Sequence, residues 1–399
     1  PLQPAQADTP GREAPALCRR EDCTGCTACA AVCPVGAITL TADHEGFLRP
    51  VIGDSCILCR SCERVCPMLQ PASPVHIPAA AHALWNSDEA ERVESSSGGF
   101  FSLLARHTLA QGGAVFGAVL DAHQTTRHVC ARSTAELGPM RGSKYVQSDL
   151  GDTFRQARAL LEAGTPVLFS GVPCQIDGLL RFLGRDYEHL LTCDLVCHGV
   201  PSPAVFRAWL DTRQGSTVRQ VRFKDKSHGW SHPYLSVTFA DGGVYTEDFN
   251  RTCYGRGFGM QLFLRPACAV CKYTSVSRPA DFTLADYWGL DPALELPVER
   301  DKGVSMVLVN SARGRAVFQE LSPRFGQVER PLEEAVAGNP RLASPLKANP
   351  RRAAFFSAFR TLPFEQVERR FLALPPLPYR AAAKALTPGM KEKLRRLMK

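Results

Sequence analysis

The sequence predicts an α/β protein, α+β overall, with a small cysteine-rich N-terminal domain, a larger mixed α/β domain and a helical C-terminal tail. Three observations support this prediction. Nine of the sixteen cysteines fall within residues 18–68, a proline-spaced stretch follows at residues 70–78, and strand-like and helix-like segments alternate from residue 81 onward. Such alternation is typical of an α/β fold.

Length and composition are those of an ordinary globular protein. With 399 residues, 45% of them hydrophobic and 22% charged, two or three domains are expected. Residues 1–17 are rich in Pro, Ala and Gln and are expected to form a disordered leader. The chain shows no secretory signal and no apolar run of about 18 residues, the length that a membrane span needs. We therefore expect a cytoplasmic protein without a transmembrane segment.

A duplicated cysteine run is the strongest pattern in the sequence. The two copies are Cys23-x2-Cys26-x2-Cys29-x3-Cys33-Pro34 and Cys56-x2-Cys59-x2-Cys62-x3-Cys66-Pro67. At this spacing three cysteines wrap one 4Fe-4S cluster and the fourth, before its proline, ligates the other cluster. Cys66 should therefore complete the first cluster and Cys33 the second. The pattern predicts a ferredoxin-like, two-cluster domain over residues 18–70, in which Cys18 is a spare thiol.

Two alternatives to iron–sulfur clusters arise from the same residues. Four thiolates also make a structural zinc site, but zinc does not explain the x3-Cys-Pro ending or the duplication. The formal charge of +8 suggests a nucleic-acid partner. Each cluster with its four thiolates carries about −2, so three clusters would lower the charge to roughly +2. No nucleic-acid partner is expected.

The segments beyond the cysteine-rich domain follow in order. Residues 71–80 are expected to be a linker, because the proline-spaced stretch suits neither a helix nor a central strand. Residues 81–330 are expected to form the larger domain, and residues 331–399 a Pro/Arg-rich helical tail with an amphipathic end. Strands are predicted at residues 114–120, 167–170, 190–196, 283–287 and 305–310, and a hairpin with strands at 234–239 and 244–249. Helices are predicted near residues 98–111, 150–163, 175–183 and 312–321.

Five further cysteines stand at the ends of predicted strands or in loops. They are Cys174, Cys193, Cys197, Cys268 and Cys271. Cys174 lies between a strand and a helix, where helix-terminal N–H groups favour a thiolate. With Cys197, Cys268 and Cys271 it supplies four thiolates from three loops, sufficient for a third 4Fe-4S cluster. A purely structural role or zinc is the alternative. Cys193 is a possible substitute for Cys197, although a buried structural thiol suits its strand position better.

Several short motifs in the larger domain occur together in one order. They are Ser95-Ser-Ser-Gly-Gly99, Arg141-Gly-Ser-Lys-Tyr145, Gly171-Val-Pro-Cys-Gln175, Cys197-His-Gly, Cys268-x2-Cys271, Asp286-Tyr-Trp-Gly289 and Asp301-Lys-Gly-Val-Ser305. With this set the sequence resembles the beta-subunit family of coenzyme F420 hydrogenases and dehydrogenases over residues 81–325. Members of that family use FAD beside a 4Fe-4S cluster to exchange hydride with a deazaflavin, and relatives reduce chlorophyll-type substrates. The resemblance implies Cys174, Cys197, Cys268 and Cys271 as cluster ligands.

Two of these motifs are candidates for binding a flavin. Ser97, Gly98 and Gly99 at a helix start would present N–H groups to a pyrophosphate, although an ordinary serine N-cap explains them almost as well. Gly142, Ser143, Lys144 and Tyr145 offer a cation and hydroxyls, where an isolated motif would be a surface turn. Lys144 would stabilise a reduced, anionic flavin. Lys144 and His198 are the catalytic candidates, and residues 224–230 contain further proton donors.

These observations predict an iron–sulfur flavoprotein oxidoreductase. Electrons would pass between two ferredoxin clusters, a third cluster and FAD, to or from a soluble carrier such as coenzyme F420 or ferredoxin, or an organic substrate. The alternative is a non-catalytic electron-transfer subunit that docks the ferredoxin clusters onto a partner redox enzyme. A zinc-stabilised nucleic-acid binder is a third possibility.

Overall fold

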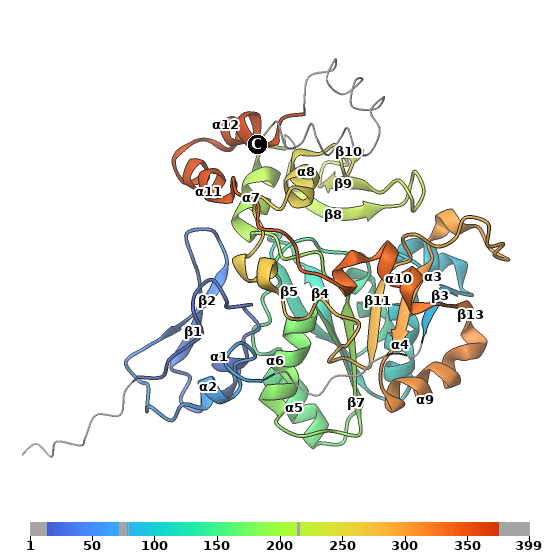
Figure 1. The fold of residues 1–399 in the computed structure, drawn as a ribbon, viewed down its shortest axis with the longest axis horizontal. Helices are drawn as coiled ribbons and strands as arrows, with labels where there is room; N and C mark the ends of the chain where they lie inside the picture. The colour runs from blue at the N-terminus through green and yellow to red at the C-terminus, as the bar shows by residue number, and fades with distance from the viewer. Residues whose placement is uncertain (1–13, 72–77, 79, 214–215, 375–399) are drawn as a thin grey trace, which may run out of the picture.

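A computed structural model of the 399-residue chain describes residues 14–71, 78, 80–213 and 216–374. A small cysteine-rich module at the N-terminal side packs against a larger mixed α/β body (Figure 1). The mixed α/β fold predicted from the sequence is confirmed. None of the described helices is both long enough and apolar enough to cross a membrane.

The cysteine-rich module consists of one antiparallel hairpin and two short helices. They are β1 (Ile38–Ala42), β2 (Leu48–Ile52), α1 (Ala28–Val32) and α2 (Ser61–Arg64). Each helix contains the third cysteine of its run and ends before the fourth. Thr27 and Arg60, each one residue after the second cysteine, both adopt a left-handed conformation with φ of 68° and 58°. The two halves of the module therefore share the same loop geometry, as the duplicated sequence requires.

An eight-stranded mixed sheet forms the centre of the larger body. Its spatial order is β13-β3-β12-β11-β7-β6-β4-β5, and β4, β6, β7 and β11 run parallel to one another. The strands are β3 (Ala81–Asn86), β4 (Ala114–Leu120), β5 (Thr126–Ala131), β6 (Val167–Gly171), β7 (Leu190–Leu195), β11 (Phe282–Asp286), β12 (Ser305–Val309) and β13 (Phe325–Arg330). The parallel strands are covered on both faces, which explains their continuous apolar sequences.

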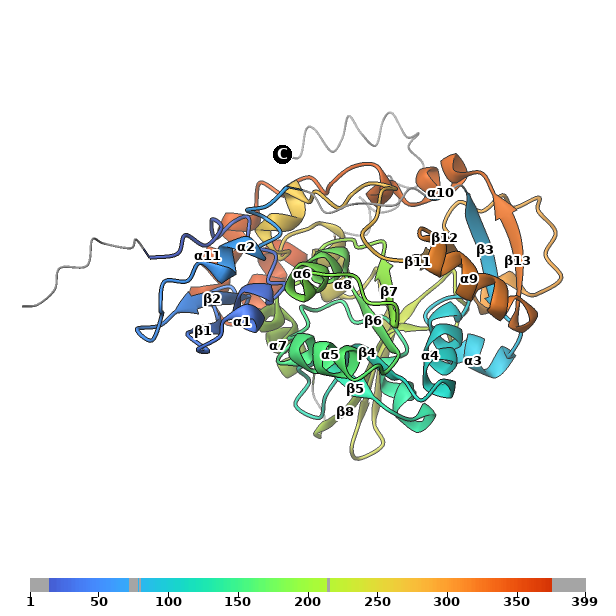
Figure 2. The same cartoon turned by 90° about the horizontal axis from the view of Figure 1, so that it is seen from below.

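Helices cover the two faces of this sheet. On one face Leu168 of β6 packs with α4 (Phe100–Ala110) and α9 (Ala312–Leu321). On the other face Phe169 packs with α5 (Thr153–Glu162) and α6 (Pro173–Leu183). Cys26 and Ala28 of the cysteine-rich module belong to this second core cluster. Figure 2 shows α1 beside α5 and α6, so the module extends the core of the larger body.

A second, three-stranded sheet lies above the carboxyl edge of the large sheet (Figure 1). It consists of β8 (Val218–Asp225), β9 (Tyr234–Phe239) and β10 (Val244–Asp248). Its core also contains residues from α7 (Pro203–Asp211), α8 (Cys253–Gly259), α11 (Arg352–Thr361) and α12 (Phe364–Val367). The remaining helices are α3 (Glu89–Glu94) and α10 (Leu332–Gly338). The region predicted as a tail is therefore helical and packed as far as Leu372.

The last residues of the predicted leader, 14–17, pack on the cysteine-rich module. The Ala16 N–H donates to Glu63 Oε1 at 2.6 Å, and Leu17 lines a cavity. The rest of the leader, most of the 71–80 linker and the amphipathic end after residue 374 lie outside the described residues.

Candidate functional site

The cysteine-rich module encloses a cavity lined by cysteines from both runs. Cys23, Cys26, Cys29 and Cys66 line it, and these are the four thiols predicted to share the first cluster. Gly25, with φ of 73°, allows the loop after Cys23 to turn around the cavity. The structure therefore brings Cys66 across the module to the first run, as the x3-Cys-Pro ending predicts.

Cys18 lines the same cavity, although the sequence suggested a thiol outside both cluster sites. The nearby thiols of Cys23 and Cys66, together with burial, raise the pKa of Cys18. Sequence reasoning missed this proximity because Cys18 lies outside the repeated spacing, and only the folded course of residues 14–23 places it there.

The second predicted set consists of Cys33, Cys56, Cys59 and Cys62. Helices α1 and α2, which hold or border two of these cysteines, pack against each other. The Cys33 sulfur accepts a hydrogen bond from the Ala37 N–H at 3.2 Å. Cys33, Cys56 and Cys59 are half-buried, so this set lies closer to solvent than the first.

A second cavity, in the larger body, is lined by Cys174, Cys197, Cys268 and Cys271. Cys174 lies in the first turn of α6, directly after β6, and Cys197 follows the neighbouring parallel strand β7. The other two cysteines come from the 3₁₀ turn Pro266–Val270 and the residue after it. Ligands commonly bind at the carboxyl ends of parallel strands. The fold thus gathers from three loops the four thiols that the family resemblance implies.

Cys193, considered as a substitute for Cys197, does not line this cavity. Its side chain is fully buried in β7, within the core that contains Leu168 and Phe282. This position agrees with a structural thiol.

The lining of the second cavity is positively charged. Arg265, Arg278 and Arg341 line it together with the four cysteines. Arg265 and Arg341 each have a buried Nη1 group without a hydrogen-bond partner among the described residues. Buried N–H groups normally find an acceptor. A 4Fe-4S cluster with four thiolates carries about −2, so the donor set, the charge and the unpaired N–H groups all fit such a cluster.

Burial raises the pKa of the free thiols in this cavity. The pKa of Cys268 is raised to about 11, because burial outweighs the hydrogen bond from the Val200 N–H and the nearby Arg265. Burial and the other cavity cysteines raise the pKa of Cys174 well above its ordinary value. Thiols of this kind lose their protons when they ligate iron, so binding of a cluster here would release protons.

The two cysteine cavities are neighbours. Thr24 lines both of them. Gly178 of α6 faces Cys26 of the module. A Cβ atom at Gly178 would lie 2.9 Å from the Cys26 Cβ and 3.0 Å from its Sγ. Cys26 is also close enough to Cys174 to raise its pKa electrostatically, after burial and the nearer cavity thiols.

The two motifs predicted to bind a flavin meet through their serines. The hydroxyls of Ser96 and Ser143 are 2.9 Å apart. The Ser97 hydroxyl donates to the Val304 carbonyl at 2.8 Å, and the Gly98 N–H donates to Ser305 Oγ at 2.8 Å. These two residues are thus bonded within the protein, whereas Gly99 begins α4 with φ of 89°.

The two catalytic candidates lie in different surroundings. Lys144 Nζ donates to the carbonyls of Pro139 and Arg141 at 2.7 and 2.9 Å, and burial lowers its pKa to about 7. His198 is exposed and lies within electrostatic reach of Asp286 and Arg341. Among the described residues no hydrogen bond joins Lys144 to His198.

Tyr145, next to Lys144, packs in the core under the three-stranded sheet. Its ring contacts those of Phe223, Phe249 and Phe258. Burial and the nearby Asp286 raise the pKa of its hydroxyl, so it stays protonated at neutral pH.

Two motifs identified separately in the sequence form one polar cluster. Lys224 Nζ lies 2.5 Å from Asp286 Oδ2, and Trp230 Nε1 donates to Asp286 Oδ1 at 2.8 Å. The rings of Trp230 and Trp288 stack with centroids 4.8 Å apart. The sequence contained both motifs, but only the packing of β8 over the end of β11 shows that they join.

Comparisons with known proteins agree with the cysteine patterns. Residues 18–69 match the family described as "4Fe-4S dicluster domain", and residues 164–330 match the family of the C terminus of the coenzyme F420 hydrogenase/dehydrogenase beta subunit. No curated protein matches the chain. A chain in a solved structure of the F420-reducing [NiFe] hydrogenase complex from Methanosarcina barkeri is 16% identical, with a TM-score of 0.45. That match covers 75% of this chain and 92% of the other. Residues 164–330 are therefore similar to the C-terminal part of the coenzyme F420 hydrogenase/dehydrogenase beta subunits, and residues 18–69 form a 4Fe-4S dicluster domain at the N-terminal side.

Proposed function

We propose that this chain is an iron–sulfur flavoprotein oxidoreductase. Two clusters in the cysteine-rich module and a third in the larger body would pass electrons to or from FAD, and FAD would exchange them with a soluble carrier such as coenzyme F420 or with an organic substrate. The adjacency of the two cysteine cavities, which share Thr24, is the observation that carries the proposal.

The arrangement suggests an order for electron transfer. The half-buried set of Cys33, Cys56 and Cys59 would hold the cluster nearest solvent. The first cluster would lie in the cavity between Cys23 and Cys66, whose Cys26 packs in the core of the larger body, and the third would lie beside Cys174 of α6. Electrons would then move from the cluster nearest solvent to the first cluster and on to the third cluster, or in the reverse direction. Cluster potentials span about −700 to +450 mV and depend on the surroundings, so the direction follows from measurement.

The two motifs that meet at Ser96 and Ser143 are suited to hold a flavin and its protons. Ser143 and Lys144 would hold a phosphate or the ring, and the Lys144 ammonium would favour an anionic flavin. Ser97, Gly98, Gly99, Gly142 and Tyr145 would shape the same loops. His198 and Lys224 would hold protons near the reacting ring. Bound FAD supplies the conversion between a two-electron hydride step and single electrons for the clusters.

A non-catalytic role is the second candidate, favoured by exposed apolar residues on the module. Val35 and Ile57 lie close in sequence to Cys33 and Cys56 of the half-buried set, and they are 45% and 54% exposed. Exposed apolar side chains near a redox centre suit contact with another protein. In that case the same clusters would deliver electrons to a partner redox enzyme.

Anaerobic purification followed by spectroscopy separates these functions. The proposal predicts flavin absorption at about 450 nm that bleaches when reduced F420, ferredoxin or NADH is added. Clusters without flavin would instead support the docking role. Zinc in place of iron, with binding to nucleic acid that weakens steeply as salt rises, would contradict both functions.

A further inference from the structure

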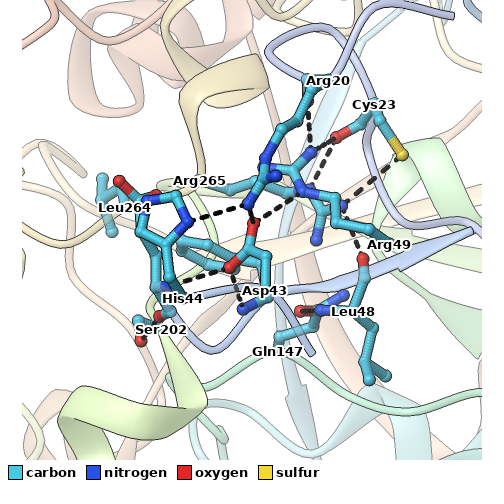
Figure 3. Close-up of polar contacts among 12 residues, drawn as sticks. Arg20, Cys23, Asp43, His44, Leu48, Arg49, Gln147, Ser202, Leu264 and Arg265 are labelled. Carbon is cyan, nitrogen blue, oxygen red and sulfur yellow. Dashed lines mark hydrogen bonds and ion pairs between the residues drawn. The ribbon is translucent and has the colours of Figure 1, made fainter. Parts of the chain in front are cut away.

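Arg265 lines the cavity of the larger body and is 2% exposed. Figure 3 shows its side chain beside Cys23 and Arg49 of the module. Arg265 begins the turn that carries Cys268. It also reaches the first cysteine of the other cavity, since Nε donates to the Cys23 carbonyl at 2.6 Å and Nη2 lies 3.6 Å from the Cys23 sulfur. A third bond, from Nη2 to the Leu48 carbonyl at 2.8 Å, fixes the side chain.

The charge of Arg265 has no counter-charge from the described part of the protein. No carboxylate forms an ion pair with it among the described residues, and its Nη1 group is buried without an acceptor. The neighbouring Arg49 differs, because its Nε lies 3.0 Å from Asp43 Oδ2 (Figure 3). A buried, unpaired cation destabilises a fold unless an anion lies nearby. The guanidinium lies within electrostatic reach of Cys23, a predicted ligand of the first cluster, and of Cys268, a predicted ligand of the third.

We propose that Arg265 is the shared counter-cation of the first and third clusters and raises the reduction potential of both. This inference rests on the proposed function, because it requires a cluster at each cavity. Reduction adds one electron to a cluster of about −2, so a nearby positive charge and a hydrogen bond to the Cys23 sulfur both stabilise the reduced form. One electron leaves one cluster and enters the other without a proton, and the shared cation stabilises the reduced form of whichever cluster holds it.

Arg265 acts through the clusters and is a positioning residue. Its role is therefore tested by measuring the reduction potentials of the clusters. The variant Arg265→Gln keeps hydrogen-bond donors but removes the charge, and Arg265→Lys keeps the charge. The control is Arg155→Gln, since the Arg155 Nε donates to the Ala31 carbonyl at 2.9 Å and Arg155 does not line the cavity of the larger body. Each purified, anaerobic protein is reduced stepwise in the presence of a redox mediator, and electron paramagnetic resonance follows the reduced clusters. The iron content of each protein is determined separately.

The counter-cation role predicts lower potentials for the first and third clusters in Arg265→Gln, with iron retained. The ratio of reduced to oxidised cluster at a fixed potential should fall on the order of tenfold, which is about 59 mV for one electron. Arg265→Lys should restore most of the shift, and Arg155→Gln should show none at the third cluster. Loss of both clusters from Arg265→Gln, with retention in Arg265→Lys, would also support the role.

Three results would overturn it. They are unchanged potentials in Arg265→Gln, a shift at only one cluster, or loss of iron from Arg265→Gln and Arg265→Lys alike. Failure of the proposed function is distinguishable, because the wild-type protein would then hold about eight irons rather than about twelve before any variant is made.

Discussion

Cys66 and Cys18 approach the first cavity from opposite ends of the cysteine-rich module. Both line it. Only Cys66 belongs to the repeated spacing that four-cysteine ligation requires. The cavity therefore contains one thiol more than a 4Fe-4S cluster needs.

We predict that Cys66→Ala removes the first cluster, about four of roughly twelve irons, because one of its four thiolates is lost. Cys18→Ala, at the same cavity, is the matched control and should keep all the iron. Iron and sulfide determination on anaerobic protein checks both. Equal iron loss in the two variants would show that Cys18 is itself a ligand.

At the residue scale, sequence analysis identified every cysteine that lines the second cavity but not Arg265. Cysteines at fixed spacing predict a metal site because their chemistry is specific. An arginine carries no such signal, since the sequence contains many, and only the folded structure shows that one is buried between two sets of thiols.

Among the elements, α6 determines how closely the first cluster approaches the larger body. Its first turn holds Cys174, and Gly178, one turn later, faces Cys26. The absence of a side chain at Gly178 lets the module pack against the helix. Helix α6 thus connects the two cavities.

We predict that Gly178→Val lowers stability by about 1–3 kcal/mol, because the new side chain overlaps Cys26 and displaces the module. Transfer of electrons between the first and third clusters should slow as well. The control Gly138→Ala places a Cβ where no atom lies within 4 Å. Thermal unfolding and rapid-mixing reduction measure the two effects, and a Gly178→Val protein that matches the control would refute this role of α6.

The accuracy of the predicted elements depended on their environment. β4 and β9 were predicted with the bounds that the structure has, because each is an apolar or alternating run that ends at a turn. β3 (Ala-His-Ala-Leu-Trp-Asn) and the charged edge strand β13 were missed. β13 pairs with β3, and β3 also pairs with β12. Tertiary contacts rather than local sequence therefore define these two strands.

At the scale of the whole molecule, the cysteine-rich module packs directly against the larger body. Phe47, from its hairpin, is fully buried in the core under the three-stranded sheet. Arg352 of α11 forms an ion pair with Glu45 of the same hairpin. Arg155 of α5 donates to the Ala30 and Ala31 carbonyls in α1. The sequence predicted two domains but contained no signal for these contacts.

We predict that Phe47→Ala lowers stability by about 3–5 kcal/mol, because it leaves a cavity in a core shared by both parts. Val51→Ala on the same hairpin is the control, since Val51 is 51% exposed and its change should stay within about 0.5 kcal/mol. Thermal unfolding of the anaerobic proteins checks this. A small effect of Phe47→Ala would mean that the two parts are stable independently.

The central claim is that one chain holds three neighbouring clusters, two in the module and one in the larger body. The most direct measurement is the iron content of anaerobic wild-type, Cys174→Ala and Cys193→Ala proteins. We expect about twelve irons per chain in the wild type, about eight in Cys174→Ala and about twelve in Cys193→Ala. Equal iron content in wild type and Cys174→Ala would contradict the central claim.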